Sequence, residues 1–316
     1  MNITALDALQ VNDIDWSGLM QLGTVTKYDA TAPELVVERS KDADILIVNK
    51  VRLTEAGFEA LPKLKYVGVL ATGYDNIDLA AARKHGVAVT NVPGYSTDSV
   101  AQLTFALLLE LCHHAGAHSD SVISENKWSN QPYYCFWDYP LIELAGKTMG
   151  IFGLGRIGTK IAEIARAFGM MVLACSRTEK QIEGITMVDF DTLLKESDVV
   201  SLNCPLTDKT KGIMNAAAFA KMKKTAFLIN TSRGGVIADD DLRKALDNGV
   251  IAGAAVDVMN GEPPKSDNPL LGAKNIIITP HMAWATKEAR IRLLDIVTKN
   301  IEDWAAGKTT NRVELI

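Results

Sequence analysis

Residues 148–176 read TMGIFGLGRIGTKIAEIARAFGMMVLACS, and this stretch decides the fold. The apolar run at 149–152 predicts a short buried strand, after which apolar residues recur at helical spacing until Gly169. Residues 171–175 form a second apolar run and predict the next strand. Three glycines with the spacing G-x-G-x-x-G stand between the first strand and the helix: Gly153, Gly155 and Gly158. The stretch therefore predicts a complete strand–turn–helix–strand unit.

A glycine-rich turn in such a unit is typical of a dinucleotide site. The glycines allow a tight turn and a close approach of the backbone. The first turn of the helix presents free N–H groups and its positive dipole end to a pyrophosphate. The motif alone is a weak signal, but the whole unit makes it a strong one. We predict that Gly153, Gly155 and Gly158 bind a dinucleotide; the alternative is a glycine-rich turn that binds nothing.

The end of the second strand departs from the usual pattern for NAD. An NAD-binding unit normally places Asp or Glu there, roughly 20 residues after the glycines. Here residues 174–178 read ACSRT, so this run has no carboxylate to accept from the ribose hydroxyls or to repel a 2′-phosphate. Arg177 can pair with that phosphate, and Ser176 and Thr178 can donate to it. We therefore predict NADP in preference to NAD; the alternative is that Arg177 is a solvated loop residue and either cofactor binds.

The composition argues against several classes of protein. A chain of 316 residues suggests two domains, and its net charge of −5 provides no basic field for nucleic acid. No apolar stretch reaches the ~18 residues that a membrane span needs, and the N-terminus does not read as a signal peptide. Four cysteines without C-x-x-C spacing favour reduced thiols in a cytoplasmic protein: Cys112, Cys135, Cys175 and Cys204. His114 and His118 are four residues apart, but no third ligand stands nearby, so we expect a helix surface and no metal.

Strand and helix patterns alternate through most of the chain. Before the glycine unit, apolar strand candidates occur at 43–48, 66–70 and 87–90. After it, further candidates occur at 198–203, 226–230, 251–256 and 276–278. We expect a long helix at about 96–117 and a final helix at about 286–306. This rhythm predicts an α/β protein with parallel sheets covered by helices.

Three loops that follow predicted strands carry polar residues suited to catalysis. Ligands of an open α/β sheet lie at the carboxyl ends of its strands. Arg233, in NTSRGG, could clamp a carboxylate through two parallel hydrogen bonds. His281 follows another strand, and a histidine can donate and accept a proton near pH 7. Glu262, in the turn GEPP, could fix the tautomer of that histidine. None of the three residues indicates a catalytic site by itself; the prediction depends on their combination.

Over nearly its whole length the chain resembles the D-isomer-specific 2-hydroxyacid dehydrogenases. The matching motifs occur in the family's order: TGYDNID at 72–78, NVPG at 91–94, GLGRIG at 153–158, PLT at 205–207, NTSRGG at 230–235, AAVDV at 254–258, GEPP at 261–264 and TPHMAWAT at 279–286. The stretch FWDYPLIELAGKT at 136–148 and the tail of TPHMAWAT are most similar to the glycerate dehydrogenase, or hydroxypyruvate reductase, members. One departure is VAQ at 100–102, where the family usually has Val-Ala-Glu.

The resemblance implies an NAD(P)H-dependent reduction of a small 2-keto acid, hydroxypyruvate or glyoxylate, to the D-2-hydroxy acid, glycerate or glycolate. It implies that His281 is the general acid/base, Glu262 its partner and Arg233 the substrate anchor. Thr72 and Gly73 would offer backbone N–H groups to the substrate carboxylate. The cofactor would be contacted at the pyrophosphate by Arg156 and Ile157, on the adenosine side by Cys204, Pro205 and Thr210, and at the nicotinamide by Thr231 and Asp257.

The family also implies two Rossmann-like domains with a cleft between them, in a homodimer. A flavodoxin-like substrate domain is expected at 1–98 and 285–316, and the dinucleotide-binding domain at 99–284. The aromatic run at 128–140, WSNQPYYCFWDYP, is expected to help form the dimer, with Trp137 able to reach the partner's active site; the alternative for Trp137 is simple packing against the hinge. Two alternatives stay open. One is another enzyme of the family, acting on phosphoglycerate or D-lactate; the other is a dinucleotide-binding corepressor, in which the Arg–Glu–His set would be dispensable.

Overall fold

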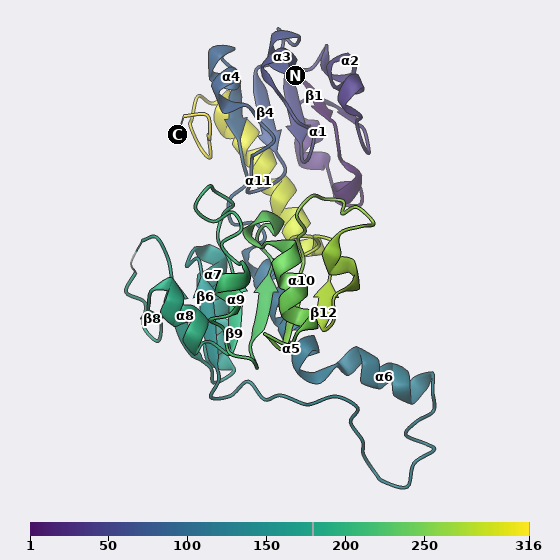
Figure 1. Cartoon of the computed structure of the whole chain (residues 1–316). Coiled ribbons are helices and arrows are strands. Elements are labelled where there is room, and N and C mark those ends of the chain that lie inside the picture. Colours follow the sequence, from purple (N-terminus) through teal and green to yellow (C-terminus); the bar gives the residue numbers. More distant parts are fainter. Residues whose placement is uncertain (179, 316) are drawn as a thin grey trace. The chain divides into compact units, whose positions relative to one another are not determined.

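The computed structural model describes residues 1–178 and 180–315. The chain divides into two compact units, which we call unit 1 (Met1–Ser96 with Trp284–Ile316) and unit 2 (Thr97–Ala283). Ile316, the last residue of the predicted substrate domain, lies outside the described residues. Each unit is an α/β layer structure in its own right (Figure 1).

Unit 1 contains a parallel sheet whose strands, among the described residues, follow the order β2-β1-β3-β4-β5. The strands are β1 (Asn2–Ala5), β2 (Thr24–Lys27), β3 (Ile45–Val48), β4 (Tyr66–Val69) and β5 (Ala88–Thr90). The helices are α1 (Ser17–Leu22), α2 (Val36–Ser40), α3 (Glu55–Glu59), α4 (Leu79–Lys84) and α11 (Lys287–Ala305).

Helices cover both faces of this sheet, which explains why its central strands are apolar throughout. All four residues of β3 are buried. Ile45 and Ile47 pack in one core cluster with Val297 of α11, whereas Leu46 and Val48 pack in another on the opposite face. A parallel strand buried on both faces reads as a continuous apolar run, because neither face meets water.

Unit 2 contains a second parallel sheet, with the order β12-β11-β10-β9-β6-β7-β8 in the described part of the chain. The strands are β6 (Thr148–Phe152), β7 (Met171–Cys175), β8 (Thr186–Met187), β9 (Val199–Leu202), β10 (Phe227–Asn230), β11 (Gly253–Val256) and β12 (Ile276–Ile278). The helices are α5 (Thr97–His113), α6 (Ala115–Ile123), α7 (Arg156–Ala167), α8 (Phe190–Glu196), α9 (Ala216–Phe219) and α10 (Asp239–Asp247).

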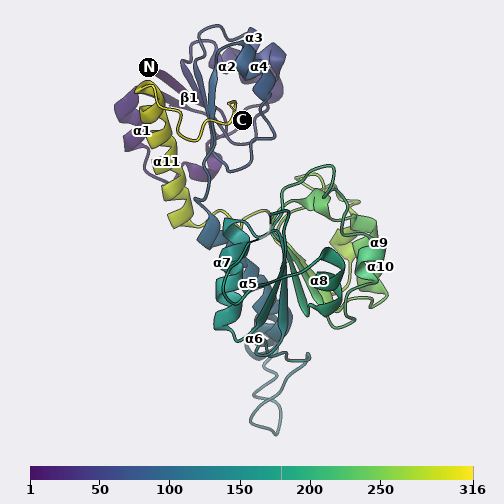
Figure 2. The same ribbon diagram turned by 90° about the vertical axis from the view of Figure 1, so that its left-hand side faces the viewer.

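The strand order of unit 2 reverses next to β6. The chain runs outward from β6 to β7 and β8, and then returns to pair β9 with the other side of β6. Helices α5 and α7 cover one face of the sheet, and α8, α9 and α10 cover the other (Figure 2). In open α/β sheets, ligands bind outside the carboxyl ends of the strands at such a switch point.

An extended segment of unit 2 connects α5 to β6. We call residues 114–143 the arm; it contains α6 and projects away from the sheet in both views (Figures 1 and 2). Its large side chains include Tyr134, which is 88% exposed, and Trp137, which is 65% exposed. The arm folds back on α6 through His118, whose Nε2 accepts a hydrogen bond from the Asp138 N–H at 3.1 Å.

The predicted α/β class with two parallel sheets is confirmed. The strand candidates of the sequence reappear as β3–β7 and β9–β12, with bounds that differ by at most two residues at either end. The sequence missed β1 (NITA), β2 (TVTK) and β8 (TM), because none of them is a continuous apolar run. The single helix expected at about 96–117 is wrong, because His114 takes a left-handed conformation (φ 48°) that ends α5 and starts α6.

Candidate active site

The loops that follow β6, β7, β9, β10 and β11 carry the predicted cofactor residues of unit 2. Because the strands are parallel and adjacent, their carboxyl ends lie along one edge of the sheet. Sequence positions from 153 to 281 thereby reach one edge of one sheet. The loop after β12 adds His281 to the same edge.

The glycine turn after β6 has the geometry that a pyrophosphate needs. Gly153 has a φ of 101°, and a Cβ at Gly158 would lie only 2.2 Å from the Gly153 carbonyl oxygen. A Cβ at Gly155 would meet no protein atom within 4 Å, so this glycine leaves open space. Helix α7 starts at Arg156, and its N-cap residue is Gly155, which has no side chain that could cap the first N–H groups. The residues present therefore fit an anion at this helix N-terminus.

The end of β7 presents no carboxylate in residues 174–178. Ser176 is half-buried, and Arg177 and Thr178 are exposed. Lys180 reaches back from this loop to the glycine turn, where its ammonium donates to the Leu154 carbonyl at 2.7 Å. Sequence reasoning missed Lys180, because nothing in its local pattern indicates a contact with the glycine turn. Two basic side chains thus belong to the loop that would meet the ribose.

The loop after β9 is fixed by its own hydrogen bonds. The Thr210 hydroxyl donates to the Pro205 carbonyl at 2.7 Å and accepts from the Thr207 N–H at 2.8 Å. Cys204 is buried, and burial raises the pKa of its thiol to about 11. The thiol is therefore neutral near pH 7, so Cys204 can line a ligand but is not a thiolate nucleophile.

The loop after β10 is held by Asn230, whose role the sequence did not reveal. Its Oδ1 accepts from the N–H and the hydroxyl of Ser232 at 3.0 and 2.8 Å. Its Nδ2 donates to the Arg233 carbonyl at 3.0 Å. The Arg233 guanidinium donates from Nη1 to the Ser232 carbonyl at 2.8 Å, which leaves further N–H groups of the fork for a carboxylate.

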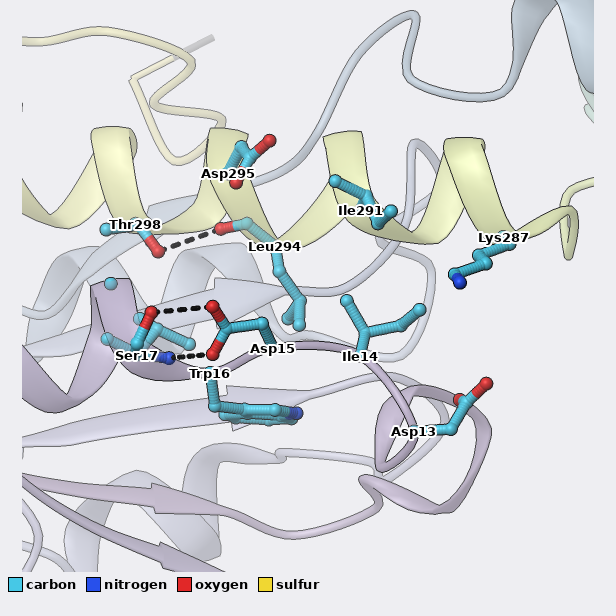
Figure 3. A pocket seen from close by; sticks show the side chains of 12 residues that line it. Asp13, Ile14, Asp15, Trp16, Ser17, Lys287, Ile291, Leu294, Asp295 and Thr298 are labelled. Atoms are coloured by element: carbon cyan, nitrogen blue, oxygen red, sulfur yellow. Dashed lines mark hydrogen bonds between the residues drawn. The ribbon is translucent and has the colours of Figure 1, made fainter.

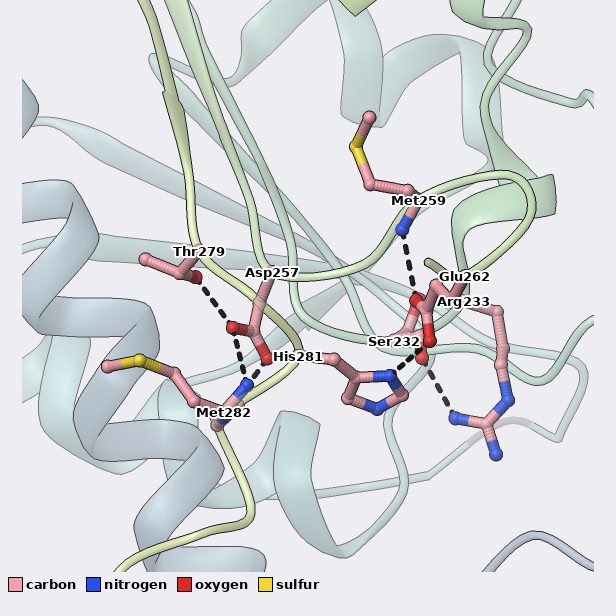
Figure 4. Close-up of polar contacts among 9 residues, drawn as sticks. Ser232, Arg233, Asp257, Met259, Glu262, Thr279, His281 and Met282 are labelled. Atoms are coloured by element: carbon pink, nitrogen blue, oxygen red, sulfur yellow. Dashed lines mark hydrogen bonds and ion pairs between the residues drawn. The ribbon is translucent and has the colours of Figure 1, made fainter. Parts of the chain in front are cut away.

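His281 and Glu262 lie side by side, although they are 19 residues apart (Figure 4). The Nδ1 atom of His281 is 2.5 Å from Oε2 of Glu262. Oε1 of Glu262 accepts from the Met259 N–H at 3.1 Å, which orients the carboxylate. Both side chains are about 30% exposed, so they can be reached from solvent. His281 has a φ of 54°, a region that non-glycine residues rarely adopt and that recurs at functional sites.

Asp257 holds the loop that carries His281. This buried carboxylate accepts from the Thr279 hydroxyl at 2.6 Å and from the Met282 and Ala283 N–H groups at 2.9 and 2.8 Å (Figure 4). The three bonds fix the backbone on both sides of His281. The sequence-based role of Asp257 was a contact with the nicotinamide; the observed contacts are all with the loop 279–283.

Thr72 and Gly73 belong to unit 1, in the loop after β4. The Thr72 hydroxyl donates to the Val92 carbonyl at 2.9 Å, and Asn91 donates from Nδ2 to the Thr72 carbonyl at 2.7 Å. Thr72 itself is exposed. Their conformation is therefore set within unit 1, by bonds to the strand-end segment that follows β5.

Comparison with known proteins decides the family. Residues 105–283 match the model of the D-isomer specific 2-hydroxyacid dehydrogenase, NAD binding domain. The chain belongs to this family. A hydroxypyruvate reductase of Blautia hydrogenotrophica is 48% identical, covering 99% of both chains. A glycerate dehydrogenase of Methylorubrum extorquens is 40% identical over 91% of both. Among solved structures, an acyclic imino acid reductase in complex with NADPH and D-Arg superposes with a TM-score of 0.89, at 31% identity over 99% of this chain and 100% of the other.

This dehydrogenase is thus an oxidoreductase with an NAD-binding domain of the Rossmann type. Residues 1–178 and 180–315 contain no group of three or more His, Cys, Asp or Glu side chains suited to a metal ion. His114 stacks on Tyr139 and His118 bonds to Asp138, so both histidines serve the arm. No helix in the described part of the chain has the length and apolar character to cross a membrane.

A separate hollow of about 490 Å³ lies in unit 1, between residues 13–19 and α11 (Figure 3). Several of its polar side chains already have hydrogen-bond partners within the protein. Asp15 accepts from the N–H and the hydroxyl of Ser17, both at 2.8 Å, and Thr298 donates to the Leu294 carbonyl at 2.9 Å. This hollow contains none of the predicted site residues, so we assign it no role in the reaction.

Proposed function

We propose that this dehydrogenase reduces hydroxypyruvate to D-glycerate and glyoxylate to glycolate, with NADPH preferred over NADH. The observation that carries the proposal is the contact of His281 with Glu262 at 2.5 Å, at the sheet edge that also bears Arg233. The similarity to a hydroxypyruvate reductase and to a glycerate dehydrogenase supports the choice of substrate. In this proposal the predicted dinucleotide-binding domain, residues 99–284, corresponds to unit 2. The predicted substrate domain, residues 1–98 and 285–316, corresponds to unit 1.

Proton transfer is assigned to His281. When bound, the reduced nicotinamide supplies a hydride to the substrate carbonyl carbon. Because Nδ1 of His281 faces Glu262, Nε2 is the atom free to give a proton to the developing alkoxide. The negative charge of Glu262 stabilises the imidazolium that must exist before this transfer.

Substrate orientation is assigned to Arg233 and to the loop of Thr72 and Gly73. The free N–H groups of the Arg233 fork would hold the substrate carboxylate and polarise the keto oxygen. Backbone N–H groups of Thr72 and Gly73 would bind the same carboxylate. Asp257 fixes the backbone around His281 through three hydrogen bonds, so the proton donor is held in place before substrate arrives.

Cofactor preference is assigned to the end of β7. Ser176 stands where a carboxylate would reject a 2′-phosphate, and Arg177 and Thr178 can bind one. The proposal adds the pyrophosphate contacts of Gly153, Gly155, Arg156, Ile157 and Gly158, and the lining of the adenosine by Cys204 and Pro205. Thr210 acts by fixing the loop that contains Pro205.

We further propose that the enzyme is a homodimer, and that it works in the cytoplasm with reduced thiols. The exposed aromatic residues of the arm support a dimer, since such residues favour interfaces. So does the outer surface of α5 and α7, where an apolar hollow of about 480 Å³ is lined by Phe105, Leu109 and Ile164. All four cysteines are free, which agrees with a reducing compartment.

The test is steady-state kinetics of the purified chain with each reduced cofactor at fixed salt. Hydroxypyruvate is expected to give the highest kcat/KM, ahead of glyoxylate and pyruvate, and NADPH is expected to exceed NADH by about ten- to a hundredfold, the value of a charge-assisted contact. Ser176→Asp should reverse the cofactor order, because the new carboxylate accepts from the ribose and repels the phosphate. Thr309→Asp, which adds the same charge at an exposed position of unit 1, should leave the order unchanged.

Other outcomes separate the rival functions. A higher kcat/KM with pyruvate or with phosphohydroxypyruvate would assign the chain to D-lactate or phosphoglycerate oxidoreduction. Dinucleotide binding without turnover of any 2-keto acid would favour a corepressor. A wild type that prefers NADH would mean that Arg177 points to solvent, while the hydride-transfer assignment would remain.

A further inference from the structure

Two buried threonine hydroxyls meet at the edge of the candidate cofactor site. Thr104 lies within α5 and is fully buried, and Thr231 directly follows β10 and is 9% exposed. Their Oγ1 atoms are 3.1 Å apart. Thr104 Oγ1 is also 2.9 Å from the Val100 carbonyl, one turn earlier in the same helix.

The direction of the bond between the two threonines follows from a count of hydrogens. Each hydroxyl has one hydrogen to donate and can accept through its lone pairs. A carbonyl oxygen only accepts, so the contact at 2.9 Å is favourable only if Thr104 donates to Val100. The hydrogen between the threonines must then come from Thr231. Its oxygen is left with lone pairs alone, and Thr231 can only accept a hydrogen bond from a ligand.

The position of Thr231 indicates which part of a dinucleotide meets it. The glycine turn after β6 and the loop after β7 lie on one side of the switch point, where pyrophosphate and adenosine ribose are expected. Thr231 lies on the other side, beyond β9, where the second nucleotide half of a dinucleotide falls. The ring on that half carries a carboxamide, whose NH2 group is a donor.

We infer that Thr104 is a positioning residue for cofactor recognition, because it accepts a hydrogen bond from the Thr231 hydroxyl. Thr231 can then accept a hydrogen bond from the carboxamide NH2, and it disfavours a ring whose substituent offers only an acceptor. This inference rests on the proposed dinucleotide site of unit 2. Thr104, a side chain of helix α5, thereby contributes to cofactor specificity without having to contact the cofactor itself. The recognised feature is the amide donor of the nicotinamide.

The test compares NADP⁺ and NAD⁺ with their 3-acetylpyridine analogues, in which a methyl group replaces the NH2. Equilibrium dissociation constants are measured by calorimetry on the full chain. The comparison uses whichever of NADP⁺ and NAD⁺ binds more tightly, together with its own 3-acetylpyridine analogue. The wild type is expected to bind the natural dinucleotide about tenfold more tightly than the analogue, since the analogue leaves the Thr231 acceptor unpaired. Thr104→Val should reduce that ratio to about two- to threefold, because the released Thr231 hydroxyl can donate to the acetyl carbonyl.

Matched variants separate this role from a structural one. Thr104→Ser keeps the hydroxyl and should keep the wild-type ratio. Thr104→Ala removes the same hydroxyl with less bulk and should behave as Thr104→Val, which covers the case in which valine disturbs the packing of α5. A simple loss of packing would weaken both dinucleotides equally and leave the ratio unchanged.

The outcomes for this inference and for the proposed function differ. A wild type that binds both members of the pair equally overturns the inference, as does a wild-type ratio in both Thr104→Val and Thr104→Ala. In either case the dinucleotide site itself stands. A wild type that binds no dinucleotide overturns the proposed function and the inference with it.

Discussion

At the scale of single residues, the chemistry depends on one imidazole nitrogen. With Nδ1 of His281 against Glu262, only Nε2 can serve the substrate. His281→Ala should lower kcat by at least about a hundredfold, the low end of what general acids contribute, while the dissociation constant of NADPH changes little. Stopped-flow or steady-state assays with hydroxypyruvate measure this effect. His85→Ala is a matched control, because His85 also contacts a carboxylate, Glu55, but lies on α4's end in unit 1. Near-normal turnover of His281→Ala would remove the assignment.

Glu262 should set the pH range of the reduction. Its negative charge favours the protonated imidazole, so Glu262→Gln should move the alkaline limb of the reductive pH profile toward acid. The measurement is kcat/KM for hydroxypyruvate across pH, with saturating NADPH. Glu55→Gln, the corresponding change in the other histidine–carboxylate pair, should leave the profile in place. A profile of Glu262→Gln that coincides with the wild type would make this carboxylate a loop residue only.

At the scale of elements, the glycine motif at the junction of β6 and α7 includes two glycines with different constraints: Gly155, the N-cap residue, and Gly158, in the first turn of α7. A Cβ at Gly158 would meet the Gly153 carbonyl at 2.2 Å, so backbone must shift. A Cβ at Gly155 meets nothing, and the φ of −82° there suits any residue. One glycine is therefore required by packing within the protein, and the other leaves room for a ligand.

Two alanine variants should separate these constraints. Gly158→Ala should destabilise the protein by about 1–3 kcal/mol, the usual range for forced overpacking, measured by denaturant unfolding. Gly155→Ala should keep the unfolding free energy and weaken dinucleotide binding, because its methyl group occupies the space of the pyrophosphate. Equal stability of the two variants would contradict the packing argument, and normal NADPH binding by Gly155→Ala would contradict the pyrophosphate assignment.

At the scale of the whole molecule, the arm is the part that a single chain leaves uncovered. Trp137 is 65% exposed and Tyr133 is 74% exposed, in a segment whose internal contacts include that of His118 with Asp138. Large aromatic side chains in water are unfavourable, so a second copy of the chain is a reasonable occupant of this surface.

Trp137→Ala tests this proposal. The dissociation constant of the dimer should rise by about tenfold or more, or the KM for hydroxypyruvate should rise if the side chain reaches a partner's site. Analytical ultracentrifugation over a concentration series and steady-state kinetics provide the two measurements. Leu9→Ala, at an apolar side chain of unit 1 that is 57% exposed, serves as the control. An unchanged sedimentation coefficient together with unchanged kinetics would mean that Trp137 packs only within its own arm.

The sequence by itself determined the features that depend on local pattern. Buried strands such as β6 and β10 show as apolar runs, because both faces of a parallel sheet are covered. The glycine spacing predicts the turn, because the turn needs backbone angles, such as the positive φ of Gly153, that glycine adopts readily. Motif order then determined the family, and parallel strands imply that Arg233 and His281 share one edge of the sheet.

Only the tertiary structure decided which side chains contact each other across long stretches of chain. Thr104 meets Thr231 over 127 residues, and no period or motif marks a threonine inside an apolar helix as a partner of a loop. Lys180 contacts the Leu154 carbonyl in the glycine turn, and Asp257 binds the loop that carries His281. The sequence also gives no sign of the left-handed conformation of His114, which separates α5 from α6. The physical reason is that such contacts depend on how the helices pack on the sheet, and this packing results from many weak interactions. The hydrophobic periodicity of a sequence shows only which face of a single helix or strand is buried.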